Sequence, residues 1–419
     1  MYRIRSVSLT LLFFSACANG QNMIHLDDLV SEGLEHNAEV LAAQKRYEAA
    51  RQRPRQVSTL PDPVLSPGYA SSGAPYPGAR LGTEPTSNIG FMISQEFPGP
   101  GKRRLRGGIA EKEAEAELRN YEAVRLSVAA RIKDAFHRLH HTYAALEVIG
   151  RGREYLTRFL RVAEARYAAG KAMQSDIFRA QTQLTILSTR ILRMEQDRRV
   201  AEAELNSLLN RSPGTPIGVP MAADPKPLAM TLEAVLDRAL RQSPAIRREQ
   251  NMIERGQLAV NLARKDLRPG YTISAGYYNM GSMPDMYQFR VDIPLPLRHR
   301  QSSALNEQAY RLSEARHNYE AVEQTLQFRI REAYAQTETS FRLMSLYQDT
   351  VIPQSGLTVE SSVASYQTGA LDFLSVLNNL IDKTEFEERY HEEMLAYWSA
   401  VTRLEELTGL QLLNEGASQ

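Results

Sequence analysis

Two groups of side chains in this sequence have the types and spacing that could bind a metal ion. Met280, Met283 and Met286 form a Met-x-x-Met-x-x-Met run, and thioether sulfurs suit Cu(I) or Ag(I). His137 and His141 stand four residues apart, so on a helix they share one face and could hold one ion. No third ligand stands at a fixed spacing, so an apolar loop tip and a solvated helix face are the favoured interpretations.

Motifs for enzymatic chemistry are absent from the sequence. It has no His-Glu-x-x-His, no Gly-x-Ser-x-Gly and no phosphate-binding Gly-rich loop. The chain has 50 Lys and Arg against 49 Asp and Glu, and this near balance gives no electrostatic footprint for nucleic acid. A single Cys excludes a disulfide framework and a cysteine-built zinc site. We expect neither an enzyme nor a nucleic-acid-binding protein, and no cofactor.

The N-terminus has the layout of a secretory signal. Residues 1–16 have a basic start, an apolar stretch and then small residues. Cys17 follows Phe-Ser-Ala, which resembles a bacterial lipobox with Phe where Leu is usual, so Cys17 would become the lipidated first residue of the mature protein. The alternative is cleavage after Ala18, a small-x-small site that leaves no lipid anchor. We expect export and favour lipid attachment at Cys17.

The chain after this segment has no helix-length apolar run. Its 419 residues suffice for a large core or about two to three ordinary domains. A mean hydropathy of −0.39 excludes a polytopic helical membrane protein. No later run of about 18 uncharged apolar residues could cross a bilayer as a helix.

An internal repeat covers most of the chain. Asn120–Val124 recurs letter for letter as Asn318–Val322, about 200 residues later. The repeat predicts five segments: a signal peptide at 1–16, a first repeat at 17–210, a Pro-rich linker at 211–230, a second repeat at 231–410 and a C-terminal tail at 411–419.

Each repeat is predicted to contain a helix, two strands, a very long helix and a last helix. The predicted ranges are 26–59, 63–72, 88–97, 106–168 and 175–210, then 232–267, 271–279, 286–293, 301–367 and 372–407. Apolar residues in the long helices follow a seven-residue frame typical of coiled coils. At 1.5 Å per residue each long helix would reach roughly 90 to 100 Å, with the two shorter helices end to end beside it. We therefore expect a rod or tube.

The strands alternate between apolar and polar residues. In the fourth strand the apolar face has Tyr287, Phe289, Val291 and Ile293, and the polar face has Gln288, Arg290 and Asp292. Strands of this length fit an outer-membrane barrel, although a soluble hairpin packed on a core would alternate in the same way. A membrane sheet must close and bacterial barrels have at least eight strands, so four strands per chain require oligomerisation. Pro67 makes the first strand the weakest.

The chain resembles the outer-membrane efflux protein family, the TolC-like exit ducts of tripartite pumps and type I secretion systems. The resemblance rests on the duplicated plan, on the strand exits at Pro98 and Pro294, and on the turns Arg-Tyr-Ala-Ala-Gly170 and Ser-Tyr-Gln-Thr-Gly369. A basic run at 102–106 follows the first of these strand exits and marks the boundary between membrane and water.

The resemblance implies a mainly α-helical homotrimer with a transmembrane β-barrel part. Four strands per chain would build a 12-stranded barrel in outer-membrane lipid, and coiled-coil helices would form a periplasmic tunnel with a belt from the linker and termini. It also implies a periplasmic adaptor and an inner-membrane pump of the RND type as partners. The adaptor-docking turns would contain Tyr167, Gly170, Tyr366 and Gly369.

Family members have acidic residues six and nine positions after the turn glycine, where carboxylates close the pore and select cations. This sequence keeps only Asp176 at the first place, with Arg179 at the second. Asp176 from three chains would form a cation-attracting ring. The alternative is that Asp176 only caps its helix.

The segment Ser94–Arg106 looks like the heavy-metal, CzcC- and CusC-like, branch of the family. We therefore favour passive conduction of heavy-metal cations. The alternatives are a duct for drugs, other organic compounds or a secreted protein, and a periplasmic coiled-coil scaffold lipoprotein that conducts nothing.

Overall fold

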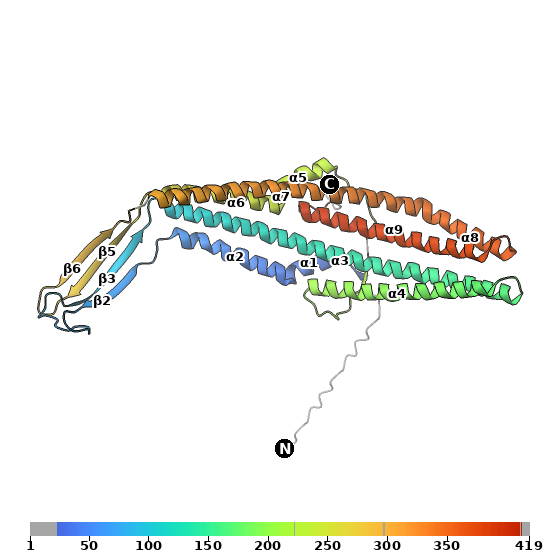
Figure 1. The fold of residues 1–419 in the computed structure, drawn as a ribbon, viewed down its shortest axis with the longest axis horizontal. Helices are drawn as coiled ribbons and strands as arrows, with labels where there is room; N and C mark the ends of the chain where they lie inside the picture. The colour runs from blue at the N-terminus through green and yellow to red at the C-terminus, as the bar shows by residue number, and fades with distance from the viewer. Residues whose placement is uncertain (1–22, 222, 296–297, 411, 413–419) are drawn as a thin grey trace, which may run out of the picture.

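The structure, a computed structural model, describes residues 23–221, 223–295, 298–410 and 412. The predicted signal peptide, Cys17 and all of the C-terminal tail except Leu412 lie outside these residues. A small sheet at one end of an elongated molecule continues into a layer of long helices (Figure 1). The predicted mainly helical fold with four longer strands is confirmed.

The element order repeats from the first half of the chain to the second. The elements are β1 (Met23–Ile24), α1 (Leu26–His36), α2 (Ala38–Ser58), β2 (Val64–Ala70), β3 (Asn88–Phe97), α3 (Lys102–Ala168), α4 (Gln174–Leu208), β4 (Val219–Pro220), α5 (Leu232–Gln242), α6 (Pro244–Lys265), β5 (Tyr271–Asn279), β6 (Met286–Asp292), α7 (Arg298–Leu346), a π-helical turn (Tyr347–Val351), α8 (Ile352–Thr368) and α9 (Phe373–Thr408).

The 67-residue helix α3 forms the spine of the first half. Val128, Ile132, Ala135 and Leu139, spaced four, three and four residues apart, are fully buried, as the seven-residue frame predicts. Helix α2 packs along the half of α3 nearer the sheet and α4 along the other half (Figure 1). The two shorter helices therefore lie in succession beside the long one, as predicted.

The predicted helix 26–59 is wrong in one respect, because Asn37 divides it into α1 and α2. Asn37 has an extended backbone, with φ −66° and ψ 127°. Its side chain accepts hydrogen bonds from the N–H groups of Glu39 and Val40 and donates one to the Leu208 carbonyl at 2.9 Å. Asparagine competes well for backbone groups at a helix N-cap, so the helix restarts there in a new direction.

Two further predicted helices are divided at or near a proline. Ser243 is extended before Pro244, which occupies the first position of α6, where its missing N–H costs nothing. In the second long helix a π-helical turn at Tyr347–Val351 separates α7 from α8. Pro353 follows this turn, and a proline that cannot donate to the preceding turn accounts for the local change in pitch.

The four longer strands form one antiparallel sheet in the order β2-β3-β5-β6. Pairing in β2 runs without a break from Val64 to Ala70, with Pro67 opposite Phe91. The predicted weakness at Pro67 does not interrupt this register, because β2 is an edge strand within the chain, where a proline is tolerated.

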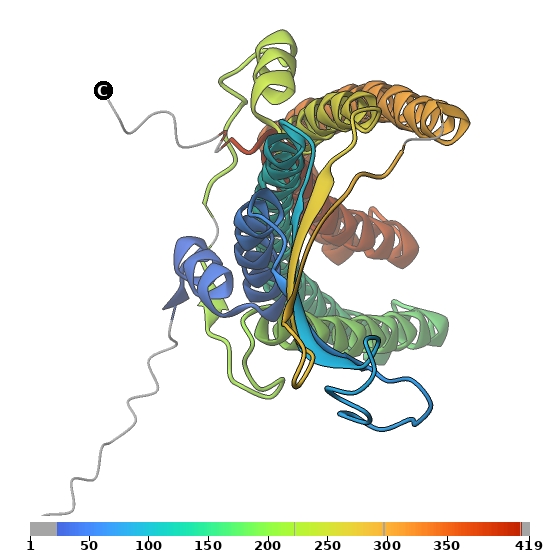
Figure 2. The same cartoon turned by 90° about the vertical axis from the view of Figure 1, so that its left-hand side faces the viewer.

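A short parallel pairing of β1 with β4, for which the sequence has no alternating pattern, joins the start of the described chain to the linker. The Tyr397 hydroxyl on α9 donates to the Lys226 carbonyl and fixes the linker further along. Figure 2 shows α1 and α5 on the convex side of the curved layer of long helices.

Candidate functional site

The first candidate site is one face of the sheet, which carries apolar side chains from all four strands. The register places these residues side by side: Leu65, Pro67 and Tyr69; Ile89, Phe91 and Ile93; Tyr271, Ile273, Ala275 and Tyr277; Tyr287, Phe289 and Val291. Phe289 is 82% exposed and Val291 59%. The rings of Phe91 and Tyr277 lie 6.1 Å apart, and those of Tyr277 and Tyr287 5.6 Å apart. So large a continuous apolar surface marks a contact with lipid or protein.

The opposite face of the sheet consists mostly of polar and small residues, with Val64, Met92, Tyr278 and Met286 as its larger apolar or aromatic side chains. The Ser94 and Ser274 hydroxyls lie 2.9 Å apart, and Arg290 donates to the Asp292 carboxylate at 2.9 Å. Gly90 is required here, because an added Cβ would lie 2.0 Å from the Tyr277 carbonyl oxygen. One face therefore suits an apolar medium and the other suits water.

Both edges of the sheet are open among the described residues. β2 pairs only with β3, and β6 only with β5. Each edge leaves a row of backbone N–H and C=O groups without partners, which in an apolar medium must be paired by another strand. No helix in the described part of the chain is long and apolar enough to cross a membrane.

The second candidate site is the far end of the helical layer, where two turns share one geometry. Gly170 ends the α3 turn with φ 70° and Gly369 ends α8 with φ 83°. Lys171 N–H donates to the Arg166 carbonyl at 2.8 Å, and Ala370 N–H donates to the carbonyl five residues before it at 2.9 Å. Only a residue that tolerates positive φ closes a helix in this way, which explains the glycine at each turn.

The two turns are clamped together by Arg166. Its Nη1 donates to the carbonyl oxygens of Tyr366 and Gln367 at 2.5 and 2.8 Å. Its guanidinium also lies 4.7 Å from the centre of the Tyr366 ring. The Tyr366 ring is packed against Phe159 and Phe373, and burial raises the pKa of its hydroxyl. The clamp combines a charge-assisted hydrogen-bond pair with a cation–π contact.

The four turn residues named from the sequence are therefore not equivalent. Tyr366 is 3% exposed, whereas Tyr167 in the matching position is 44% exposed. The repeat alone gave no signal for this difference, because it arises from contacts between the two turns.

Asp176 lies in the first turn of α4 and its carboxylate accepts a hydrogen bond from the Met173 N–H at 3.4 Å. Asp372 caps α9 in the reciprocal manner: it is the N-cap residue itself and accepts from the N–H and hydroxyl of Ser375 at 3.3 and 2.5 Å. These hydrogen bonds lower the pKa of Asp372. Both carboxylates thus cap helices next to the turns, which neither requires nor prevents a pore role for Asp176.

The methionine run lies at the turn between β5 and β6. Met286 begins β6, opposite Tyr278, while Met280 and Met283 are half-buried in the turn. The turn is held by polar groups: Ser282 donates to the Gly82 carbonyl in the first hairpin at 2.7 Å. No sulfur is needed to hold this turn.

The expected solvated helix face is wrong for His137 and His141, because both face α9 and neither is exposed. Their surroundings differ. His137 is buried and stacked on Trp398, with ring centres 4.7 Å apart, and burial lowers its pKa to about 3. His141 lies against His391, whose pKa burial lowers to about 4. Among the described residues no group of three or more His, Cys, Asp or Glu side chains could hold a metal ion. His391 could not be found from sequence spacing, because it is about 250 residues away.

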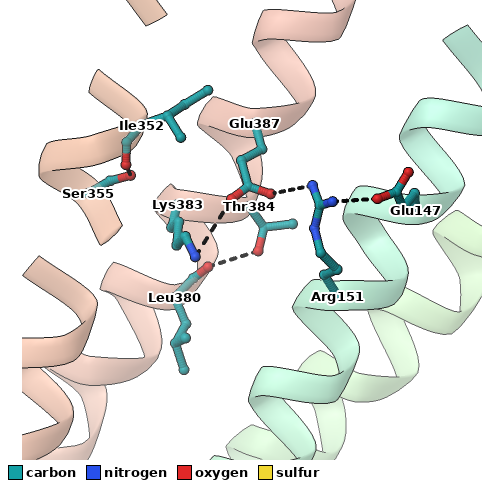
Figure 3. A network of polar contacts seen from close by, with 8 residues as sticks. All are labelled: Glu147, Arg151, Ile352, Ser355, Leu380, Lys383, Thr384 and Glu387. Carbon is teal, nitrogen blue, oxygen red and sulfur yellow. Dashed lines mark hydrogen bonds and ion pairs between the residues drawn. The ribbon is translucent and has the colours of Figure 1, made fainter. Parts of the chain in front are cut away.

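Charged side chains also join α3 to α9 further along α3 toward the turn at Gly170. Figure 3 shows this network. Arg151 donates to Glu147 at 2.6 Å and to Glu387 at 3.1 Å. Lys383 lies 3.6 Å from Glu387 and 4.7 Å from the centre of the Tyr155 ring. The Lys383 and Glu387 side chains are only 20% and 17% exposed, so this network resists salt better than a surface pair.

A family model described as outer membrane efflux protein matches residues 29–211 and 235–409, which is most of the chain. The chain belongs to the outer membrane efflux protein family. This is a family of channels and not of enzymes. The family resemblance inferred from the strand exits and the glycine turns is confirmed.

Solved channel structures share the fold of this efflux protein. CusC, in structures that concern folding and transmembrane channel formation, has a TM-score of 0.77 at 16% identity, over 91% of each chain. The outer membrane protein VceC from Vibrio cholerae has a TM-score of 0.78 at 18% identity, over 92% of this chain and 96% of that one. The CmeC outer membrane channel of Campylobacter jejuni has a TM-score of 0.77 at 16% identity, over 98% of this chain and 94% of that one. None of the curated protein sequences matches the chain.

Proposed function

We propose that this chain is the outer-membrane exit duct of a tripartite efflux system, in which three copies form one 12-stranded barrel. The observation that carries the proposal is the four-stranded sheet, with one continuous exposed apolar face and two open edges. Lipid accepts such a face, and only closure with further strands pairs the edges. A non-conducting scaffold has no use for this surface.

The helical layer extends the barrel as a periplasmic tunnel, with its concave side toward the lumen and α1, α5 and the linker as an outer belt (Figure 2). A periplasmic adaptor docks on the turns at Gly170 and Gly369. Tyr167 presents an exposed ring to the adaptor, whereas Tyr366 acts from within by holding its turn through Arg166. An inner-membrane pump of the RND type supplies the energy, and conduction through the duct is passive.

Conductance tests the duct itself. Purified full-length protein is expected to run as a detergent-stable trimer and to conduct ions in planar bilayers. Trimers that never conduct, even after the clamp is removed by Arg166→Ala, would favour the scaffold. Lipid attachment at Cys17 is tested by measuring the intact mass of the mature protein. The mass of a lipidated protein exceeds that of the polypeptide by the mass of the acyl chains.

Heavy-metal cations are the favoured cargo, on the resemblance of Ser94–Arg106 to the heavy-metal branch. Growth of a deletion strain, with and without the restored gene, is compared on Cu, Ag, Zn, Co and Cd salts and on dyes, detergents and antibiotics. Sensitivity confined to metals supports this cargo. Sensitivity to organic compounds alone assigns the duct to drugs or metabolites.

The carboxylate of Asp176 is proposed to attract cations at the narrow end of the tunnel. Asp176→Asn is expected to lower the cation selectivity of single channels, because three negative charges leave the pore. Asp372→Asn is the control, since it also removes one negative charge per chain beside a tip turn, and asparagine keeps an oxygen that can accept the capping hydrogen bond. An equal effect of the two variants would reduce Asp176 to a helix cap.

A further inference from the structure

We propose that a groove between α2 and α3, directly beside the sheet, binds the phosphate head group of an anionic phospholipid. The inference rests on the proposed position of the sheet in the membrane. The groove has a volume of about 510 Å³ and its lining includes Tyr47, Arg51, Arg55, Ser58, Arg104 and Gly107. We call it the arginine groove.

The arginine groove concentrates positive charge from two helices. Arg51 and Arg55 come from the last turns of α2, just before β2, and Arg104 from the first turn of α3, just after β3. All three are exposed, and no carboxylate within the described ranges forms an ion pair with them. Their neighbours behave differently: Arg53 pairs with Glu113 at 3.3 Å and Lys102 with Asp266 at 2.9 Å.

Acidic residues line only the end of the groove that lies away from the sheet. Glu111 and Glu115 are one and two turns further along α3 from Gly107, and Glu115 is paired with Lys112 at 2.8 Å. The end next to the sheet therefore has Arg55, Ser58 and Arg104 in its lining and no acidic residue, whereas Arg51 lies one turn further from the sheet, near the level of Glu111. Guanidinium groups bind phosphate oxygens with paired, planar hydrogen bonds, so this end suits a phosphate better than it suits a metal or a neutral ligand.

The arginine groove opens on the convex side of the helical layer. Residues three or four apart along a helix share one face, and Arg104, Gly107 and Glu111 line the groove. The face of α3 that contains these residues continues along the helix to Arg125 and Ala129. These two residues line a second groove together with residues of α1. Because α1 lies on the convex side (Figure 2), the arginine groove does as well.

The apolar face of the sheet lies on this same side. Lys102 and Arg106 are about 200° around α3 from Arg104, and so face the concave side. They line a different cavity together with Glu96 and Thr272 of the polar sheet face and with Tyr271 at the start of β5. The apolar face must then be convex, above the arginine groove. A lipid with its acyl chains on that face has its phosphate at the level of Arg55 and Arg104, with Arg51 one helical turn further from the sheet.

The test uses the full-length protein in vesicles of equal parts phosphatidylglycerol and phosphatidylcholine. After mild extraction, native mass spectrometry measures the ratio of the two lipids retained by the protein. The wild type is expected to retain phosphatidylglycerol preferentially. Each charge near an anionic surface changes partition by about fivefold. The triple variant Arg51→Gln, Arg55→Gln and Arg104→Gln is therefore expected to lower the retained ratio by up to about a hundredfold.

A triple variant at the far end of the helices, Arg153→Gln, Arg161→Gln and Arg193→Gln, has the same change in charge at exposed positions. It is expected to retain both lipids as the wild type does. Equal retention of the two lipids by the wild type, or no difference between the variants, overturns the inference. If the channels conduct in bilayers, the proposed duct function stands whatever the lipid result. A wild-type protein that does not insert into bilayers overturns both the duct and the lipid-binding proposals.

Discussion

At the scale of single residues, His137 shows how burial, helped by the nearby charges of His140 and Lys133, lowers the pKa of an ionisable group in this protein. Its ring is stacked on Trp398, its Nδ1 has no hydrogen-bond partner in the described structure, and its pKa is lowered to about 3. Between pH 6.5 and pH about 3, His137 is protonated in the unfolded chain but not in the native protein. Stability therefore falls as pH falls through this window, by about 1.4 kcal/mol per pH unit.

His137→Phe is expected to shift acid unfolding to lower pH, because phenylalanine keeps the ring stack and cannot be protonated. The helical circular dichroism signal during an acid titration measures the midpoint. His391 is also buried with a lowered pKa and is unchanged in this variant. The midpoint of acid unfolding should therefore shift only in part. The control His36→Gln changes an exposed histidine and should leave the midpoint in place. An unchanged midpoint for His137→Phe would show that His137 does not limit acid stability.

The Arg166 clamp predicts a local loss of order in Arg166→Lys. A lysine cannot hold both carbonyl oxygens and lie flat on the Tyr366 ring, so opening of the turn should become easier by roughly 1–3 kcal/mol. Hydrogen exchange of residues 365–372 is expected to accelerate. Arg179→Lys, an exposed change on the first turns of α4, is the control. Equal hydrogen-exchange rates for residues 365–372 in the two variants would show that Arg166 is not needed to hold the turn.

At the scale of elements, the alternation along β6 separates an apolar side from a polar side, which in the proposed barrel face the lipid and the lumen. Phe289→Arg is expected to cost about 2–4 kcal/mol per chain, the cost of an arginine in the middle of the membrane. Gln288→Arg places the same side chain on the polar face. The amount of heat-stable trimer in the outer-membrane fraction should fall only for Phe289→Arg. Equal loss for both would contradict the assignment of the faces.

The elements also show where sequence patterns were sufficient. The four strands and α3 could be predicted because periods of two and seven residues are local properties. The helix breaks at Asn37 and at Tyr347–Val351 could not be predicted in this way, because the same apolar pattern continues across each break. Asn37 restarts the helix by bonding the Leu208 carbonyl, a partner 171 residues away.

At the scale of the whole molecule, the open edges of β2 and β6 require a partner outside the chain. Ser66 and Gln288 stand at the same level of the sheet, through Met92 and Gly276. They are about 14 Å apart within one chain, too far for a disulfide. Ser66→Cys with Gln288→Cys, in a Cys17→Ala background, is therefore expected to give covalent trimers on oxidation.

The strands of a barrel are staggered, so Arg290→Cys is tested as a second partner for Ser66→Cys. A denaturing gel under oxidising conditions measures the product. Ser66→Cys alone should remain monomeric on that gel. Monomers from both double variants would argue against pairing of β2 with β6 in a neighbouring copy.

The sequence by itself determined the element types, the turns at Gly170 and Gly369 and the family, because these depend on residues close together in the chain. Only the tertiary structure decided that Tyr366 is buried while Tyr167 is exposed, and that Arg166 joins the two turns. It also placed His391 beside His141. These contacts join residues about 200 to 250 positions apart, and only the packing of whole helices brings such residues together.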